Sequence, residues 1–180
     1  ILNLFGRVSD PQVSPDGKRI VYGVTYTSIK ENRRNRELFV MDIDGQHNVQ
    51  ITRTPASESN ARWLDNDRLL FVCDGKLWIM QADGTGRQQV TGTDKSISEF
   101  SISPTGDRIL FISTVPSGMK PTDLDPSLDK STGRVIDDLM YRHWDCFVEE
   151  IPHSFTALFD GKTLSNVTDL LEGQLFELPT

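Results

Sequence analysis

The chain has 180 residues, of which 37% are hydrophobic, and its formal net charge at pH 7 is −7. This length and hydrophobic content allow a buried core, and the acidic balance argues against a nucleic-acid surface, which needs clustered Lys and Arg. No apolar run approaches the length of a membrane span, and two cysteines, Cys73 and Cys146, do not form a disulfide framework. Ile1 is not a natural start, so we expect a trimmed or internal segment.

The first elements in the chain form one repeat, at about residues 10–52. In the block Val13–Tyr22, Pro15 and Gly17 suit a tight turn, and the residues after the turn suit an apolar strand. The polar stretch Ser28 to Arg36 is predicted to be a loop. The strands predicted for this repeat are Gln12–Ser14, Arg19–Thr25, Glu37–Asp42 and His47–Ile51.

Two further repeats follow with the same order of turns and strands. The second, at about residues 59–91, contains the two-residue hairpin Asp74-Gly75. Its predicted strands are Ala61–Trp63, Arg68–Cys73, Lys76–Gln81 and Arg87–Val90. The third, at about residues 98–168, is interrupted by an insertion at 114–154. Its predicted strands are Glu99–Ser103, Arg108–Ser113, Phe155–Phe159 and Thr163–Val167.

One motif marks the end of each repeat. An Asp-Gly pair is followed, seven positions after the Asp, by an aliphatic residue and then Thr: Asp44-Gly45 with Ile51-Thr52, Asp83-Gly84 with Val90-Thr91, and Asp160-Gly161 with Val167-Thr168. A period of roughly 40 residues with four strands per repeat is typical of β-propeller blades. We therefore predict an all-β fold of three four-stranded antiparallel blades belonging to a larger propeller.

The insertion is expected on one face of the propeller. In a four-stranded meander, the loop between strands two and three lies on the same face as the loop that joins one blade to the next, so extra material gathers where a partner or substrate would be met. Residues 114–132 are predicted to be loop. Residues 133–144 carry apolar side chains at helical spacing and are predicted to form a short helix whose apolar stripe serves packing.

The chain lacks the motifs of a self-contained catalytic site. There is no G-x-S-x-G nucleophile elbow and no Gly-rich phosphate loop. His47, His143 and His153 have no metal-ligand spacing, and the Asp residues of the repeats are interpreted as turn formers. We expect no catalytic residue, metal site or cofactor in this chain.

The blade sequences resemble those of the prolyl oligopeptidase family. The motifs that carry this likeness are V-S-P-D-G-K-R-I-V-Y, L-F-V-M-D-I-D-G and Q-I-T, and similar blades occur in TolB proteins. The segment Arg134–Asp145, which ends in R-H-W-D, is similar to one in dipeptidyl-peptidase V and acylaminoacyl-peptidase-like enzymes. The resemblance implies a propeller that caps a C-terminal α/β-hydrolase domain of a periplasmic or secreted serine peptidase, with a cytoplasmic location also open. The hydrolase domain is absent from this chain.

The resemblance also implies candidate substrate-binding residues. Glu149 and Glu150 either bind the free α-amino group of a peptide or form an acidic loop before the next strand. Trp144 and Arg142 either line a pocket or anchor the insertion. A non-catalytic TolB-like propeller that binds envelope proteins and a ligand-binding propeller stay open as alternatives. Because three blades leave apolar faces uncovered, we also expect the chain to self-associate, or to be a remnant of a longer protein.

Overall fold

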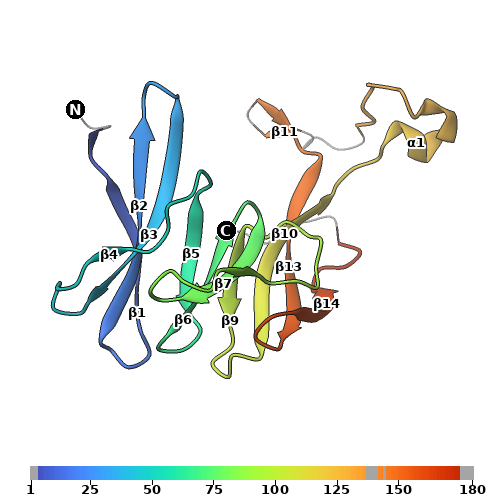
Figure 1. Ribbon diagram of the computed structural model, residues 1–180. Helices are drawn as coiled ribbons and strands as arrows, with labels where there is room; N and C mark the ends of the chain where they lie inside the picture. Colours follow the sequence, from blue (N-terminus) through green and yellow to red (C-terminus); the bar gives the residue numbers. More distant parts are fainter. Residues whose placement is uncertain (1–3, 137–141, 144, 175–180) are drawn as a thin grey trace.

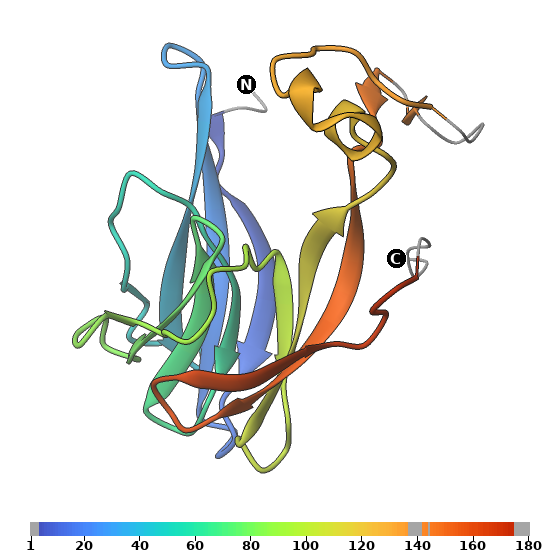
Figure 2. The same ribbon diagram turned by 90° about the vertical axis from the view of Figure 1, so that its right-hand side faces the viewer.

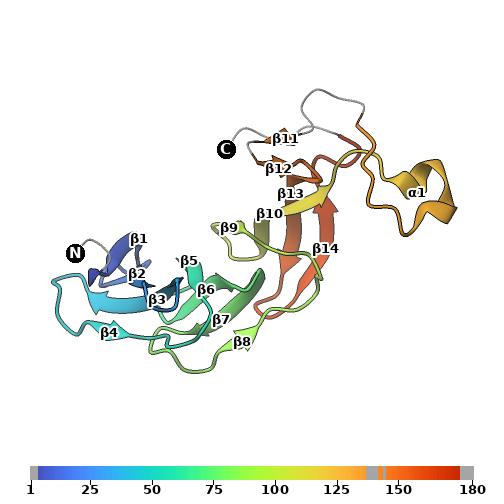
Figure 3. The same ribbon diagram turned by 90° about the horizontal axis from the view of Figure 1, so that it is seen from above.

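The computed structural model describes residues 4–136, 142–143 and 145–174. These residues form three four-stranded antiparallel sheets that stand side by side in an arc, together with a small two-stranded ribbon (Figures 1 and 3). Each sheet is one blade, and its strands follow one another in sequence order. The all-β propeller-blade architecture predicted from the repeats is confirmed.

Blade 1 has longer strands than the sequence indicates. The second and third strands stay paired as far as Ser28 and Arg33, so the stretch Ser28 to Arg36, expected as a loop, is mostly a hairpin. Thr25, Tyr26 and Thr27 favour an extended backbone. Opposite Thr25, the largely buried Arg36 donates to the Ser9 hydroxyl, and Arg34 opposite Thr27 is exposed. The strands of blade 1 are β1 (Arg7–Val13), β2 (Arg19–Ser28), β3 (Arg33–Asp42) and β4 (Val49–Gln50).

Blade 2 follows the predicted pattern most closely, because its strands two and three match the predicted bounds. Its strands are β5 (Glu58–Trp63), β6 (Arg68–Cys73), β7 (Lys76–Gln81) and β8 (Gln88–Gln89). Blade 3 is built from strands on both sides of the insertion, in the order β14-β13-β10-β9. Its strands are β9 (Glu99–Ile102), β10 (Arg108–Pro116), β13 (Glu150–Phe159) and β14 (Leu164–Asp169).

The insertion is shorter than predicted, and its helical turns, at 121–124 and 126–128, lie in the part that was predicted to be loop. Because β10 and β13 stay paired up to Pro116 and Glu150, residues 117–149 rather than 114–154 leave the sheet. The helix expected over 133–144 is wrong where the structure describes it, since 133–136 have no regular structure and Arg142–His143 form a strand. Residues 137–141 and 144 lie outside the described residues. The regular elements of the insertion are α1 (Pro121–Leu124), η2 (Pro126–Leu128), β11 (Arg142–His143) and β12 (Cys146–Phe147).

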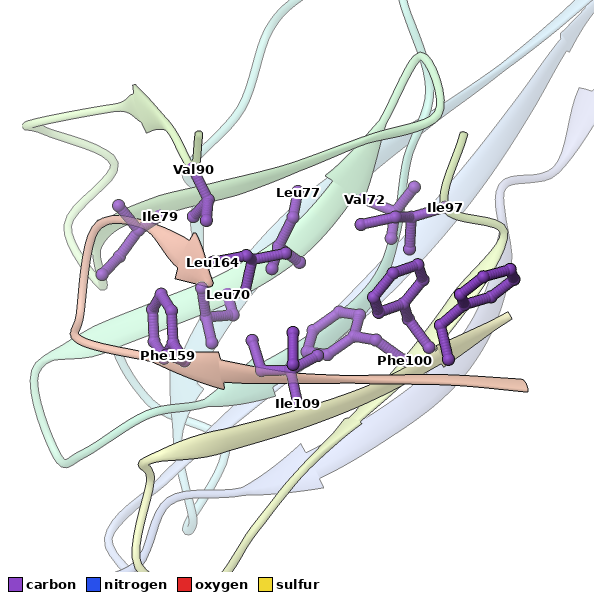
Figure 4. Packing of buried hydrophobic residues seen from close by; sticks show 13 residues of the cluster. Leu70, Val72, Leu77, Ile79, Val90, Ile97, Phe100, Ile109, Phe159 and Leu164 are labelled. Carbon is purple, nitrogen blue, oxygen red and sulfur yellow. The ribbon is translucent and has the colours of Figure 1, made fainter. Parts of the chain in front are cut away.

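Two apolar cores lie between the blades. The register of each sheet sends alternate residues to opposite faces, and we call the face toward the preceding blade the leading face and the other the trailing face. The trailing face of blade 1 packs on the leading face of blade 2, for example Val21 and Leu38 against Leu69 and Phe71. The trailing face of blade 2 packs on the leading face of blade 3 in the same manner (Figure 4).

The aspartates of the repeats form turns, as predicted. The Asp83 carboxylate accepts a hydrogen bond of 2.9 Å from the Thr85 N–H, and Asp160 accepts one of 2.9 Å from the Lys162 N–H. The Thr85 hydroxyl also donates to Asp83 at 2.7 Å, and this bond, followed by the N–H bond, holds the pKa of Asp83 below the usual range. The backbone N–H bonds from Lys162 and Thr163 do the same for the pKa of Asp160. The repeated Asp-Gly pair is therefore part of the scaffold.

The long insertion and the blade-to-blade links lie at one end of the sheets, which we call the insertion end. The link after blade 1 contacts the end of β3, where Asn35 Nδ2 donates to the Thr54 carbonyl at 2.8 Å. The link after blade 2 contacts the β6–β7 turn, where the Ile97 N–H donates to the Gly75 carbonyl at 2.8 Å. Figures 1 and 2 show β10 and β13 rising into the insertion at this end. The candidate site residues that the structure describes, Arg142, Glu149 and Glu150, therefore lie at this end.

Candidate functional site

The root of the insertion is formed where β10 ends and β13 begins. Pro116 is paired with Glu150, and the Ser117 N–H donates to the Glu149 carbonyl at 2.9 Å. The Thr114 hydroxyl, on β10, donates to Glu150 Oε2 at 2.6 Å. A continuous two-stranded ladder therefore fixes the backbone of both glutamates, and Glu150 belongs to a strand rather than to an acidic loop.

The two glutamates differ in their partners. Glu149 forms an ion pair with Arg134, in which Nη2 and Oε1 are 2.9 Å apart, and the Glu149 side chain is 65% exposed. Glu150 is also exposed and accepts the Thr114 hydroxyl. The charge of Glu149 is thus balanced by an arginine of the insertion itself, whereas Glu150 contacts a neutral hydroxyl.

Two arginines lie against Phe147 near this ion pair. The Arg134 guanidinium carbon is 4.1 Å from the centre of the Phe147 ring, and that of Arg142 is 5.3 Å away. Arg142 also donates a long hydrogen bond of 3.4 Å to the Asp145 carbonyl. The structure therefore brings Arg142 and Glu149 into one cluster through Arg134 and Phe147, with Glu150 next in the chain. The predicted site residue Trp144 lies outside the described residues.

Each blade also buries one glutamate or histidine near the insertion end of its leading face, a feature that the sequence did not indicate. These residues are Glu37, Glu58 and His153, which are 6%, 0% and 2% exposed. Glu37 accepts the Thr52 hydroxyl at 2.8 Å and the Thr54 N–H at 3.3 Å. In the sequence, each of these residues is a charged or polar residue beside an apolar strand. Exposed strand ends commonly show the same pattern, so the sequence alone does not indicate burial.

Glu58 is held between blades 1 and 2 by an ion pair with Arg87, in which Nη1 and Oε1 are 2.8 Å apart. The Thr54 hydroxyl donates to the same oxygen at 2.7 Å, while Oε2 has no hydrogen-bond partner among the described residues. The Arg87 guanidinium also lies over the rings of Phe71 and Trp78. Burial, and after it the nearby Glu58 charge, raises the pKa of the Cys73 thiol. Glu58 with Arg87 and Thr54 is therefore a structural contact between blades 1 and 2.

His153 is paired with Asp169 across β13 and β14, with 2.9 Å between Nδ1 and Oδ2. Burial raises the pKa of Asp169, but the hydrogen bonds from His153 and the Leu171 N–H outweigh it, so the pKa lies below its usual range. Asp169 borders a shallow hollow of about 420 Å³ at the insertion end, between the link after blade 2 and blade 3. The hollow is lined by Lys95, Phe155, Val167, Thr168, Asp169 and Glu172.

Among the residues that the structure describes, no three His, Cys, Asp or Glu side chains are grouped as ligands for a metal ion. No helix in the described part of the chain is long and apolar enough to cross a membrane. Cys73 is buried and Cys146 is exposed, and both are free thiols.

The comparisons with known proteins point to peptidases. No family model matches the chain. It is 40% identical over 178 residues to a dipeptidyl-peptidase 5 of Porphyromonas gingivalis, covering 96% of this chain and 26% of that protein. It is 34% identical over 184 residues to a dipeptidyl-peptidase 5 of Porphyromonas endodontalis, covering 99% of this chain and 27% of that protein. The chain thus spans about a quarter of the length of these curated relatives.

Solved structures show the same fold. The acylaminoacyl peptidase of Pyrococcus horikoshii matches with a TM-score of 0.67 at 12% identity, over 93% of this chain and 25% of that one. A TolB structure from Agrobacterium tumefaciens matches with a TM-score of 0.56 at 19% identity, over 94% of this chain and 50% of that one. At these identities the likeness concerns the fold alone.

The fold is that of a segment of a β-propeller, which occurs both in peptidases and in TolB. Within that class, the chain is homologous to part of the dipeptidyl-peptidase 5 proteins. The resemblance to the peptidase branch, predicted from the blade motifs and the insertion, is confirmed.

Proposed function

We propose that this chain is the propeller segment of a serine exopeptidase, of the dipeptidyl or acylaminoacyl type, and that its insertion end admits and orients short peptides. The observation that carries the proposal is the 40% identity with a dipeptidyl-peptidase 5 over nearly the whole chain. The catalytic residues would belong to an α/β-hydrolase domain outside these 180 residues. The periplasmic or secreted location stays a prediction.

Within this role, the insertion root supplies the groups that contact the substrate. An exposed carboxylate suits the free α-amino group of a peptide, because a charge-assisted hydrogen bond is strong once water is excluded. Glu149 is already balanced by Arg134, so we propose Glu150 as the main amine ligand and Glu149 as its support. Arg142 would offer guanidinium donors to the peptide backbone, and Trp144 stays a candidate that lies outside the described residues.

A chimera tests this assignment. The corresponding quarter of the Porphyromonas gingivalis dipeptidyl-peptidase 5 is replaced by this chain, and release of dipeptides is measured for the chimera and its variants. Glu150→Gln is expected to raise KM about tenfold or more, because hydrogen bonds to charged groups contribute about 1.5–3 kcal/mol. Glu149→Gln is expected to have a smaller effect.

The matched control is Glu31→Gln. Glu31 is an exposed glutamate at the insertion end that is also paired with an arginine, Arg33, at 3.4 Å, but it lies on blade 1, outside the insertion. This substitution should leave KM unchanged. Equal KM values for the parent chimera and for both insertion variants would remove the glutamates from the proposed site.

The alternative function is a TolB-like propeller that binds proteins without catalysis. The observation in its favour is the TM-score of 0.56 with a TolB structure. It predicts that the chimera folds and releases no dipeptides. The identity with two peptidases places this alternative second.

A further inference from the structure

Arg134 binds the carboxylate of Glu149 in the manner of a substrate ammonium. Its Nε and Nη2 both lie 2.9 Å from Glu149 Oε1, so two N–H donors converge on one carboxylate oxygen. An ammonium group presents its N–H donors to a carboxylate in the same charge-assisted way. A peptide amine that binds Glu149, as the proposed function requires, therefore competes with Arg134 for the same carboxylate.

The two partners of this ion pair differ in how firmly the backbone holds them. The Ser117 N–H donates to the Glu149 carbonyl at 2.9 Å, and the next residue, Glu150, is paired with Pro116 in the β10–β13 ladder. Arg134 lies in the irregular stretch 133–136, directly after a glycine, which has wide backbone freedom. A separation of the pair would therefore move Arg134 and leave the Glu149 carboxylate in place.

The ion pair is also weak enough to be exchanged. The Arg134 and Glu149 side chains are 46% and 65% exposed, so water screens the attraction between their charges. The Arg134 guanidinium carbon lies 4.1 Å from the centre of the Phe147 ring. Because a guanidinium stacks on an aromatic ring without the help of a carboxylate, Arg134 keeps this second contact when it leaves Glu149. Its release from Glu149 thus leaves it within the insertion root.

We propose that Arg134 is a specificity-determining residue that selects peptides with a free α-amino group. This inference rests on the proposed binding of the peptide amine by Glu149 and Glu150. In the free protein Arg134 occupies Glu149, and an incoming ammonium takes its place, so one cation replaces another. An N-acylated peptide brings no charge to this position, and Glu149 would exchange a charged donor for a neutral one. Of the dipeptidyl and acylaminoacyl types, the arrangement therefore favours the dipeptidyl type.

The exchange can be followed by NMR in the 180-residue chain. The Arg134 Nε–H resonance is assigned by its loss in Arg134→Gln, and Glu149→Ala gives its position in the released state. Alanyl-alaninamide should move the resonance of the parent chain toward the released position, whereas N-acetyl-alanyl-alaninamide should leave it in place. A peptide that shifts the backbone resonance of Glu150 but not that of Arg134 would overturn the competition and leave amine binding intact. A peptide that shifts neither would overturn both.

Kinetics of the chimera with the Porphyromonas gingivalis dipeptidyl-peptidase 5 test the effect on specificity. Arg134→Gln frees Glu149, so KM for alanyl-alanine p-nitroanilide should fall about two- to fivefold, as expected for the loss of an exposed ion pair. The Ki of N-acetyl-alanyl-alaninamide should not change. Arg134→Lys keeps the positive charge and should keep KM close to that of the parent chimera.

Two further comparisons separate competition from structural support. In a Glu149→Gln background, Arg134→Gln should no longer change KM, because no carboxylate is left to release. The matched control is Arg33→Gln, which removes an exposed ion pair with Glu31 on blade 1 and should leave KM unchanged.

The response of KM to Arg134→Gln decides between the outcomes. A rise in KM would overturn the inference, because Arg134 would then support the site rather than compete for it. An unchanged KM, together with a raised KM in Glu150→Gln, would also overturn it but would leave the proposed amine binding standing. An unchanged KM in both variants would remove the proposed amine binding as well.

Discussion

At the scale of single residues, the charged groups between the blades matter more to stability than those on the surface. Arg87 holds the fully buried Glu58, and its guanidinium lies over two aromatic rings. Arg68, by contrast, pairs with Asp65 at 2.7 Å where both side chains are more than 40% exposed. The buried pair contributes more to the free energy of unfolding than the exposed pair, because water screens the exposed charges.

The first prediction follows from that contrast. Arg87→Met keeps an unbranched apolar stem but leaves the Glu58 carboxylate buried without its ion partner, so the free energy of unfolding should fall by about 3 kcal/mol. Arg68→Met should lower it by about 1 kcal/mol or less. Urea denaturation of both variants measures the difference. Equal losses would show that Glu58 finds another partner or is reached by water.

The second prediction concerns acid stability. The pKa of Asp169 is lower in the folded chain than its usual value, so its contribution to stability is present at neutral pH and is lost as pH falls below about 4. Asp169→Asn should therefore lower the free energy of unfolding at pH 7 by about 1–2 kcal/mol. At pH 3 the two proteins should differ by less. A difference that stays constant between pH 7 and pH 3 would contradict the role of the Asp169 charge.

At the scale of elements, adjacent blades are also joined at their outer strands. The Thr91 N–H donates to the Lys162 carbonyl at 3.2 Å, and the Leu164 N–H donates to the Thr91 carbonyl at 2.7 Å. Gly92 follows this contact with φ of 99°, and a Cβ there would lie 1.9 Å from the Leu164 carbonyl oxygen. Gly161 has a similar φ of 95°, but a Cβ built on Gly161 would have no neighbouring atom within 4 Å.

These two glycines give a matched third prediction. Gly161→Ala should cost only the left-handed backbone conformation, about 1–2 kcal/mol. Gly92→Ala should cost the same plus about 1–3 kcal/mol for the displaced β13–β14 hairpin. Thermal or urea unfolding of the pair separates the two effects. Similar stabilities of the two variants would mean that the link between blades 2 and 3 shifts freely.

Prediction from sequence succeeded where the repeat constrains the chain and failed where it does not. The bounds of β6 and β7 follow from the Asp74-Gly75 hairpin and the apolar residues around it. The extension of β2 and β3 was missed because polar residues can continue a hairpin beyond the sheet edge. The insertion was misassigned because Val135 and Ile136 fit a helical pattern, while Arg142–His143 pair with Cys146–Phe147 in a ribbon.

The arrangement of the candidate site could likewise be predicted only in part. Sequence resemblance made Glu149 and Glu150 candidates, and they stay candidates. It could not show that Arg134 balances Glu149, because the two residues are 15 positions apart in an irregular segment. The buried Glu37, Glu58 and His153 were also beyond sequence reasoning. Their burial depends on which face of the blade each residue occupies and on what the neighbouring blade supplies.

At the scale of the whole molecule, the described residues form three propeller blades with one long insertion. The insertion root gathers Arg134, Arg142, Glu149 and Glu150 at one end of the sheets. The homology to dipeptidyl-peptidase 5 covers about a quarter of each relative. The central claim is that this quarter is a working part of a peptidase and not only a similar fold.

The most direct test is dipeptide release by the chimera with the Porphyromonas gingivalis dipeptidyl-peptidase 5. It should be compared with a second chimera that carries the matching blades of the Agrobacterium tumefaciens TolB structure, which shares the fold at 19% identity. Both proteins should first be shown to be folded. The account predicts dipeptide release by the first chimera and none by the second, whereas a folded first chimera without activity would contradict it.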